Sequence, residues 1–375
     1  MGKKTFLILG GYGTAGKLIA ELLLQETDVQ LIIAGRSLEK AQATANRLNQ
    51  KFDGNRALAQ HLDAADADGL KNAFSKIDFV VVSSSTLTYA ENVVKAAMAA
   101  GIDYLDTQPS GLGKTEILES MRNDIKQAGR CFITEGGIIP GVPAALVQYA
   151  ASYFDRLEIA QVCYISQYDW KSLSPSPVMW TELCQVFSNL QPLVFKDGVW
   201  KKGMIKKFDF GPVFGEQTCG PVFMGEMKEL ANTISSLKEM GLFHGKSTNW
   251  FIRSIFMPLN SVLLSLTPKT AKPLGKLFIW GLRTFNKPPY HAIMMLKAKG
   301  WKDDKYLSLQ VRISKEDGFF LTASSVVACL LQYLDGGIAP GLWYQANVLE
   351  PKRMMSDFER LGVKVEVQYD EIGKV

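Results

Sequence analysis

The sequence predicts an α/β fold in which a parallel, doubly wound sheet carries an inserted α+β domain. Two observations lead to this fold class. From Thr5 to Thr134, short apolar runs alternate with amphipathic helix-like segments, which is the pattern of buried parallel strands joined by helices. After Gly141 the segments alternate in polarity and are separated by Gly, Pro and Asp, which is typical of a mixed or antiparallel sheet. The length of 375 residues suits two domains.

The first domain is predicted as strands and helices that alternate along the chain. The strands are short apolar runs, expected at 5–9, 29–34, 79–82, 103–106 and 131–134. The helices carry an apolar stripe, and they are expected at 17–25, 38–49, 66–74, 89–100 and 116–128. Gly101 follows the fourth helix, in the position where glycine commonly ends a helix.

The rest of the chain shows a different pattern. Strands are predicted at 157–168 and 306–314, with a hairpin partner for the latter at 319–323, and hairpins or loops at 187–202 and 208–215. Helices are predicted at 323–334 and 351–361. The expected organisation is a parallel-sheet domain at 1–145, an α+β substrate and dimerisation domain at 146–323, and C-terminal helices at 324–375 that return to the first domain.

A glycine-rich loop joins the first strand to the first helix. It comprises Gly10, Gly11, Tyr12, Gly13, Thr14, Ala15 and Gly16. The first glycines permit a tight turn, Gly13 lets the backbone approach a pyrophosphate, and Gly16 lets the helix pack closely on the strand. The helix N-terminus then faces the phosphates. Because a strand precedes the loop and a helix follows it, these residues predict a Rossmann dinucleotide-binding domain rather than an ordinary glycine-rich turn.

The end of the second strand predicts which dinucleotide is bound. An NAD enzyme usually has an acidic residue there for the ribose 2′-hydroxyl, whereas this chain has Gly35, Arg36 and Ser37. Arg36 can bind a 2′-phosphate and Ser37 can add a hydrogen bond, so NADP(H) is predicted over NAD(H). The alternative is that Arg36 is a solvated loop residue.

Two further strand ends supply candidate cofactor ligands. Asp63 lies where the next strand after 29–34 would deliver a residue to the adenine rim; the alternative is that it caps the helix 66–74. Ser83, Ser84 and Ser85 end the strand 79–82. The carboxyl ends of parallel strands face the cofactor crevice, so these serines are expected to bind phosphate or ribose; a simple polar loop is the alternative.

Four passages of the sequence are distinctive: 10–20 with 34–37 and 39–41, 93–97 with 100–107, 135–141, and 334–341. Together they resemble the saccharopine dehydrogenase family, in its saccharopine reductase-like branch. The resemblance implies a nucleotide-binding domain interrupted by a substrate domain. It also implies NAD(P)-dependent chemistry that makes or breaks a secondary amine through an imine or, in a lipid-related branch, reduces a carbon–carbon double bond.

The chain departs from this family at two places. Ile139 stands where the third motif usually has an acidic residue before Pro140 and Gly141, and Ser85 and Thr86 stand where Pro-Phe is usual. In the loosely matched middle region, about 150–320, the sequence does not identify the arginines that would hold substrate carboxylates. These departures affect the implied amino-acid substrate more than the dehydrogenase class.

Candidate catalytic groups lie at strand ends in both domains. Hydride transfer needs a nearby proton source, and Asp106 and Glu135 each end a strand at the crevice. Tyr168 follows a strand of the second domain. For each of them an ordinary cap or loop role is the alternative. The predicted substrate contacts are Gly137, Pro140, Gly141 and Trp180.

The histidines and cysteines limit other chemistry. No metal site is predicted, because the three histidines lack metal-ligand spacing. The five cysteines are scattered and odd in number, which is typical of reduced, buried thiols in a cytoplasmic protein. The N-terminal residues have neither the length nor the cleavage site of a secretory signal.

The net charge of +5 is unevenly distributed. Residues 240–302 contain no Asp or Glu but ten Lys and Arg. Three interpretations stay open for this acid-free segment: amphipathic helices that cover the second domain or form a homodimer face, a peripheral membrane contact through 246–287, and a lid over an apolar or anionic substrate. Its apolar runs are too short to span a membrane, and their aliphatic character argues against nucleic acid.

Three functions follow, in order of preference. The first is NADP(H)-dependent hydride transfer to an imine, or from a secondary amine, of a small amino-acid-derived substrate, as the resemblance implies. The second is NADPH-dependent reduction of an enoyl or carbonyl group on an apolar, lipid-like metabolite, which Ile139 and the acid-free segment favour. The third is a protein that binds NADP(H) without turnover. A cytoplasmic homodimer is expected, with the peripheral membrane contact as an open addition.

Overall fold

The computed structural model describes four stretches of the chain, residues 3–111, 113–173, 191–245 and 280–371. The chain divides into two compact units. The first unit consists of Met1–Val142 and Thr322–Asp357, and the second of Pro143–Leu321 and Phe358–Val375. Each unit contains one large β-sheet.

The first unit contains a seven-stranded sheet in the order β15-β6-β5-β4-β1-β2-β3. Its strands are β1 (Thr5–Leu9), β2 (Gln30–Gly35), β3 (Ala57–His61), β4 (Phe79–Val82), β5 (Asp103–Asp106), β6 (Cys131–Thr134) and β15 (Gly341–Tyr344). All neighbouring strands run parallel, and the direction of the strand order reverses between β1 and β4. This is the doubly wound arrangement, so the predicted fold class is confirmed.

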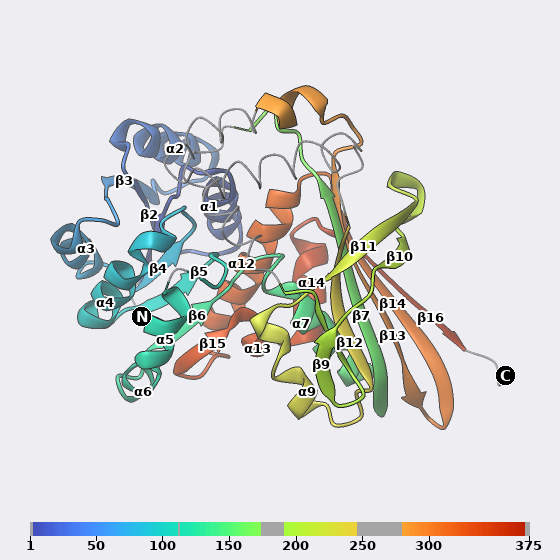
Figure 1. Cartoon of the computed structure of the whole chain (residues 1–375). Helices are drawn as coiled ribbons and strands as arrows, with labels where there is room; N and C mark the ends of the chain where they lie inside the picture. Colours follow the sequence, from blue (N-terminus) through green and yellow to red (C-terminus); the bar gives the residue numbers. More distant parts are fainter. Residues whose placement is uncertain (1–2, 112, 174–190, 246–279, 372–375) are drawn as a thin grey trace, which may run out of the picture. The chain divides into compact units, whose positions relative to one another are not determined.

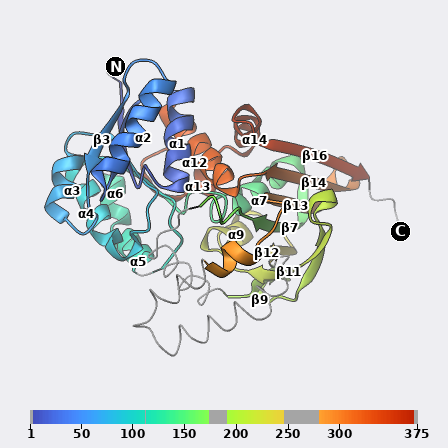
Figure 2. The same ribbon diagram turned by 90° about the horizontal axis from the view of Figure 1, so that it is seen from above.

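Helices cover both faces of this sheet (Figures 1 and 2). One face carries α1 (Thr14–Glu26), α2 (Leu38–Lys51) and α12 (Gly318–Leu334), and the other carries α3 (Ala67–Phe74), α4 (Ala90–Ala100), α5 (Lys114–Ser120) and α6 (Arg122–Gln127). Phe6 stacks on Phe79 with ring centroids 4.8 Å apart and lies against Tyr333 of α12, while Leu7 and Val80 pack into the opposite core. Burial on both faces explains why the strands are continuously apolar.

The second unit contains a mixed sheet in the order β10-β11-β12-β7-β13-β14-β16, with β8 paired to β12 and β9. Its strands are β7 (Arg156–Gln167), β8 (Leu193–Lys196), β9 (Val199–Lys202), β10 (Lys206–Asp209), β11 (Glu216–Val222), β12 (Glu239–Gly245), β13 (His291–Lys302), β14 (Lys305–Lys315) and β16 (Lys364–Glu371). β7 and β12 run parallel, and the other pairs run antiparallel. The predicted mixed sheet of the second domain is therefore confirmed.

The remaining helical elements connect these strands. They are α7 (Val142–Tyr153), α9 (Leu230–Thr233), α13 (Gln345–Val348), α14 (Pro351–Arg360) and the 3-10 turns η1 (Leu87–Tyr89), η2 (Gly211–Val213) and η3 (Gly225–Met227). The four described cysteines are unpaired and buried, as predicted for reduced thiols: Cys131, Cys163, Cys219 and Cys329. Cys184 lies outside the described residues.

Three predicted elements differ from the structure. The segment 319–323 is the beginning of α12 and no hairpin partner, because Asp317 Oδ1 accepts the Phe319 N–H at 2.8 Å and starts a helix there. The partners of β14 are β13 and β16. The predicted helix 116–128 is broken at Met121 into α5 and α6. Residues 364–371, expected among C-terminal helices, form strand β16 of the second sheet.

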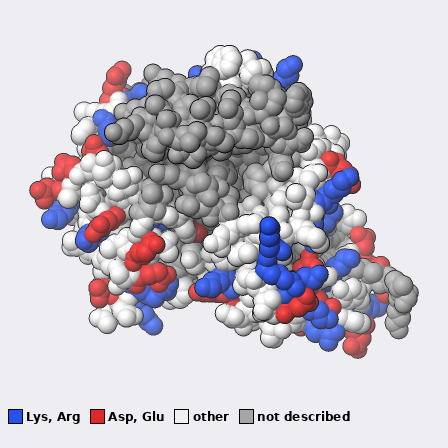
Figure 3. Space-filling model, viewed as in Figure 1, with Lys and Arg blue, Asp and Glu red and all other residues white. Residues whose placement is uncertain are grey.

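The acid-free segment 240–302 enters the second sheet at both ends. Residues 240–245 lie in β12 and residues 291–302 form β13. Residues 246–279, and with them most of the predicted membrane contact 246–287, lie outside the described residues. No helix in the described part of the chain is long and apolar enough to cross a membrane. On the face drawn in Figure 3, the basic and acidic side chains are interleaved.

Candidate cofactor and catalytic site

The glycine loop between β1 and α1 has almost no room for side chains. Gly10 has a φ of +86°, and a Cβ on it would lie 2.5 Å from the carbonyl oxygen of Ser83. A Cβ on Gly16 would lie 2.3 Å from the carbonyl oxygen of Gly10. Both obstacles are backbone atoms, so no side-chain rotation can relieve them. The glycines therefore let α1 pack closely against β1 and β4. The strand order reverses between these two strands.

The N-terminus of α1 has no side-chain cap. Its N-cap residue is Gly13, no side chain accepts a hydrogen bond there, and the first turn contains no acidic residue. A Cβ on Gly13 would meet the carbonyl oxygen of Gly10 at 3.0 Å. The free N–H groups and the helix dipole favour an anion at this end. The cradle therefore fits the pyrophosphate of a dinucleotide.

The end of β2 carries the groups predicted for the 2′-phosphate. Arg36 is exposed. Ser37 is the N-cap of α2, and its Oγ accepts the Lys40 N–H at 3.3 Å, so its hydroxyl proton can still be donated. The Ser37 N–H donates to the Tyr12 hydroxyl at 3.1 Å. A cation, hydroxyl donors and a helix N-terminus lie together here, and this set fits a phosphate.

Asp63 does not cap α3. Its Oδ1 accepts the Ala65 N–H at 3.1 Å and so shapes the turn after β3. The N-cap is Asp66, whose Oδ1 accepts the Gly69 N–H at 2.9 Å. The cap alternative for Asp63 is therefore wrong, and its contact with the adenine rim stays a prediction.

The serines after β4 lie where the sequence placed them, beside the glycine loop. The nearest atoms to a Cβ on Gly10 belong to Ser83 and Ser84. The Ser84 and Thr86 hydroxyl oxygens are 3.0 Å apart, and Ser85 is half-buried. The structure thus brings these serines to the pyrophosphate cradle, although no described contact assigns them a ligand.

A buried ion pair occupies the carboxyl end of β5. Lys114 Nζ donates to Asp106 Oδ1 at 2.8 Å, and both side chains are fully buried. Nζ also donates to the Gln108 carbonyl at 2.6 Å and to Thr134 Oγ1 at 3.0 Å. Asp106 Oδ2 accepts from the hydroxyls of Tyr104 and Thr134 at 2.9 and 2.7 Å. This network satisfies both charges, which is the condition for retaining them in a protein interior.

Glu135 directly follows β6 and is buried close to this ion pair. Its backbone has a φ of +57°, and Ser110 Oγ donates a short hydrogen bond to its Oε1. Burial raises the pKa of the Glu135 carboxyl; the charge of Lys114 and the Ser110 hydrogen bond oppose this rise, and Asp106 adds to it. A carboxyl that keeps its proton more readily than usual is suited to act as a general acid.

The sequence of this unit matches a known domain. Residues 6–132 match the family model of the saccharopine dehydrogenase NADP binding domain. These residues are therefore similar to a saccharopine dehydrogenase NADP-binding domain. The match confirms the family resemblance and the prediction of NADP(H) as the cofactor.

Two curated proteins and one solved structure are similar to the chain. Carboxynorspermidine synthase of Vibrio cholerae is 27% identical over 176 residues, covering 42% of this chain and 42% of its own. Saccharopine dehydrogenase [NADP(+), L-glutamate-forming] of Saccharomyces cerevisiae is 29% identical over 142 residues, covering 38% of this chain and 29% of its own. The matches therefore span less than half of either relative. An apo structure of saccharopine dehydrogenase (L-Glu forming) from Saccharomyces cerevisiae shares the fold, with a TM-score of 0.69, 16% identity, and coverage of 98% of this chain and 100% of its own.

The loop that follows the matched residues 6–132 is fixed within the first unit. Gly137 and Gly141 have φ values of +129° and +120°. The Gly137 carbonyl accepts from Ser325 Oγ at 2.9 Å and from Gln345 Nε2 at 3.4 Å, and its N–H donates to Gln345 Oε1 at 3.3 Å. Pro140 and both glycines are buried. These contacts give the loop a structural role, and its contact with substrate stays a prediction.

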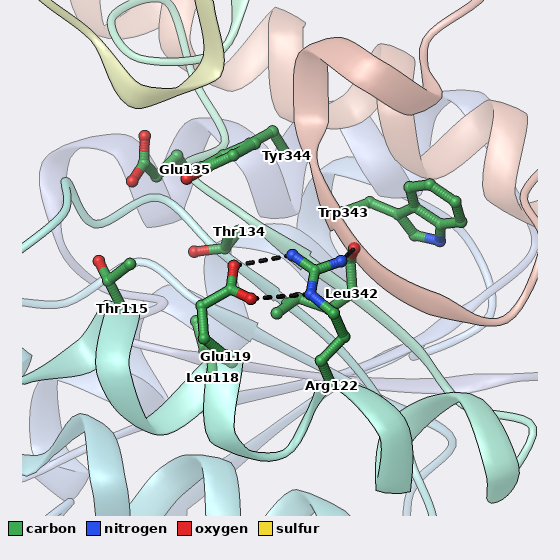
Figure 4. A pocket seen from close by; sticks show the side chains of 9 residues that line it. All are labelled: Thr115, Leu118, Glu119, Arg122, Thr134, Glu135, Leu342, Trp343 and Tyr344. Carbon is green, nitrogen blue, oxygen red and sulfur yellow. Dashed lines mark hydrogen bonds and ion pairs between the residues drawn. The ribbon is translucent and has the colours of Figure 1, made fainter. Parts of the chain in front are cut away.

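A small cavity near Glu135 is too small to hold a substrate. Its volume is about 10 Å³, which is room for about one water molecule. It is lined by Thr115, Leu118, Glu119, Arg122, Thr134, Glu135, Leu342, Trp343 and Tyr344. The Arg122 guanidinium forms two 2.7 Å hydrogen bonds with Glu119 and one of 3.1 Å with the Leu342 carbonyl (Figure 4). Arg122 is therefore directed to these partners and not to Glu135.

The third predicted catalytic residue, Tyr168, belongs to the second unit. Its hydroxyl lies 3.2 Å from that of Tyr164, and its ring packs against Phe319 with centroids 5.0 Å apart. The predicted substrate contact Trp180 lies outside the described residues. Among the residues that the structure describes, no group of three or more His, Cys, Asp and Glu could hold a metal ion.

Sequence reasoning missed the partners that position the β5 and β6 ends. Lys114 lies eight residues after Asp106 in a Gly-rich passage, and only the buried pairing reveals its role. Gln345 reaches Gly137 from 208 residues along the chain. A usable signal was Lys114 itself, a cation that follows the apolar strand ending in Asp106, because a buried carboxylate needs a partner.

Proposed function

We propose that the protein is an NADP(H)-dependent oxidoreductase that transfers a hydride to an imine, or from a secondary amine, of an amino-acid-derived substrate. The observation that carries the proposal is the uncapped N-terminus of α1, framed by Gly10 and Gly16, in a domain of the saccharopine dehydrogenase NADP-binding type. The names of the two curated relatives, a carboxynorspermidine synthase and a saccharopine dehydrogenase, support the substrate class.

The cofactor would supply the hydride, and the residues of the chain would hold it and manage the proton. The N–H groups at the start of α1 would hold the pyrophosphate, and Arg36 and Ser37 would hold the 2′-phosphate. In this strand order a dinucleotide would bind outside the carboxyl ends of the strands, and β5 and β6 end at the same edge of the sheet. Glu135 stands at that end with a raised pKa, so its carboxyl is the proposed source of the proton that the reduced product takes up.

Ile139 favours a second candidate. The resemblance implies an acidic residue before Pro140, and the chain has an aliphatic one there. Without that carboxylate, a substrate with an enoyl or carbonyl group and an apolar body is the alternative to an imine. Binding of NADP(H) without turnover is the third outcome that the experiment below distinguishes.

A substrate panel followed by NADPH absorbance tests the proposal. Keto acids combined with amines or amino acids are compared with enoyl and carbonyl compounds that carry apolar chains, each with NADPH and with NADH. We expect NADPH oxidation only with the keto acid and amine pairs. Oxidation only with the enoyl or carbonyl compounds would replace the first candidate by the second, and cofactor binding with no oxidation would reject both.

A further inference from the structure

We propose that Tyr12 determines the preference for NADP(H), because it fixes the backbone at the end of β2 and directs its hydroxyl proton to the 2′-phosphate. This inference rests on NADP(H) as the cofactor, and it goes beyond Arg36 as the source of the preference. Tyr12 lies in the glycine loop, two elements away from Arg36 in the sequence, so its role follows from the structure and not from the usual motif.

A hydrogen bond joins Tyr12 to the loop that must receive the phosphate. The Ser37 N–H donates to the Tyr12 hydroxyl oxygen at 3.1 Å. Because that oxygen acts as the acceptor, the phenol proton stays available for donation to a second acceptor. Ser37 Oγ likewise accepts the Lys40 N–H, so its own proton is available too. Two neutral donors therefore lie at the strand end that also carries the exposed residue Arg36.

Gly35 provides the space in which the Tyr12 ring lies. The three atoms nearest to a Cβ on Gly35 are all in the Tyr12 side chain, with Cε1 at 2.6 Å and the hydroxyl oxygen at 2.8 Å. Gly35 does not have a positive φ, so its backbone conformation would accept alanine. The glycine at this position is therefore required by the ring and not by the backbone.

The chemistry of the site distinguishes the two cofactors. A 2′-phosphate is a dianionic acceptor, whereas a 2′-hydroxyl needs at least one acceptor from the protein to donate to. Gly35, Arg36 and Ser37 offer no carboxylate at the strand end, and the one acidic residue in the first turn of α2, Glu39, is exposed. Tyr12, Ser37 and Arg36 can each donate a hydrogen bond to a phosphate. Removal of the Tyr12 hydroxyl should therefore weaken the binding of NADPH more than that of NADH.

Equilibrium dissociation constants for NADPH and NADH test the proposal without any substrate. We expect Tyr12→Phe to weaken NADPH binding about 10-fold and to change NADH binding by less than about 2-fold, since one hydrogen bond to a charged group is lost. Tyr369→Phe is the matched control, because it removes an exposed phenol hydroxyl from the second sheet. It should leave both constants unchanged.

A substitution of Gly35 tests the contact between Gly35 and the Tyr12 ring. Gly35→Ala should displace the Tyr12 ring and weaken NADPH binding to a similar extent. In a Tyr12→Ala background the ring is absent, so Gly35→Ala should then have no further effect. This non-additivity distinguishes a shared contact from two separate disturbances of the loop.

The outcomes separate the inference from the function on which it depends. An equal loss of NADPH and NADH binding in Tyr12→Phe, an unchanged preference, or tighter NADPH binding would each overturn the role of Tyr12. If the unsubstituted protein binds neither dinucleotide, the proposed function fails as a whole. Thermal unfolding of each variant confirms that the comparison is made on folded protein.

Discussion

The two halves of the carboxyl edge of the parallel sheet are built differently. At the ends of β1, β2 and β4, glycines let the chain segments pack closely, α1 begins without a side-chain cap and Arg36 is exposed. At the ends of β5 and β6, Lys114, Asp106 and Glu135 are buried and hydrogen bonded to their neighbours. The first half offers free donors to a ligand, whereas the second has satisfied its own polar groups.

Cofactor affinity should therefore depend on the first half of the edge, and the free energy of unfolding on the second half. Substitution of an exposed side chain in the open half, such as Arg36, should change the dissociation constants of the cofactor and leave the fold nearly intact. Substitutions in the closed half should change the free energy of unfolding, because a buried charge without its partner is costly. The contrast predicts which measurement responds to each variant and how strongly.

Lys114→Met should have the largest effect. The substitution leaves the Asp106 carboxylate fully buried without its ion-pair partner. Breaking such a pair costs about 3–5 kcal/mol. Denaturant unfolding of the whole protein measures this loss in the free energy of unfolding.

An exposed lysine supplies the matched control for Lys114. Lys95 pairs with Glu91 on the surface of α4, with both side chains 60% exposed. Lys95→Met should therefore cost no more than about 0.5 kcal/mol. The double variant Lys114→Met with Asp106→Asn should regain part of the loss, since it removes both charges. Equal costs for Lys114→Met and Lys95→Met would contradict the contrast between the two halves.

Arg36→Asp should have the next largest effect, on binding and not on stability. It replaces a cation for the 2′-phosphate by an acceptor for a 2′-hydroxyl. The ratio of the NADPH and NADH affinities should fall about 100-fold in favour of NADH. Fluorescence titration with each dinucleotide measures both constants.

Stability provides the internal control for Arg36→Asp. Because Arg36 is exposed, the substitution should change the free energy of unfolding by no more than about 0.5 kcal/mol. An unchanged cofactor ratio would show that Arg36 is the solvated loop residue of the alternative interpretation.

The sequence predicts the open half well because its signals are local. The loop Gly10–Gly16 and the passage Gly35–Ser37 each place their functional groups within a few residues of one strand end. The closed half depends on contacts between distant residues, such as Gln345 with Gly137, which no periodicity encodes. Apolar residues in 319–323 fit a strand or a helix equally well, and the cap at Asp317 decides for the helix. The strict alternation in 364–371 did carry a strand signal, which the prediction of C-terminal helices overlooked.

Glu135→Gln should have a smaller effect than Lys114→Met, and the pH dependence of the free energy of unfolding reveals it. Burial raises the pKa of Glu135 in the folded state, so the folded protein binds this proton more tightly than the unfolded chain. The resulting stabilisation is fully present below the ordinary carboxyl pKa and is lost as the pH rises through the raised value. Glutamine cannot ionise and still accepts the Ser110 hydrogen bond. The free energy of unfolding of the unsubstituted protein should therefore fall, relative to Glu135→Gln, as the pH rises above the ordinary carboxyl pKa and through the raised one.

Glu119 gives a control with the opposite sign in the same unit. Hydrogen bonds from Arg122 lower the pKa of Glu119, so its stabilisation is present above the ordinary carboxyl pKa and is lost as the pH falls through the lowered value. Glu119→Gln should thus cost stability at neutral pH and progressively less in acid, with an amplitude limited by solvent exposure. Opposite pH slopes for the two variants would attribute the behaviour of Glu135 to burial. If both variants show the Glu119 pattern, the carboxyl of Glu135 is ionised at neutral pH without penalty, and its proposed role as a proton donor fails.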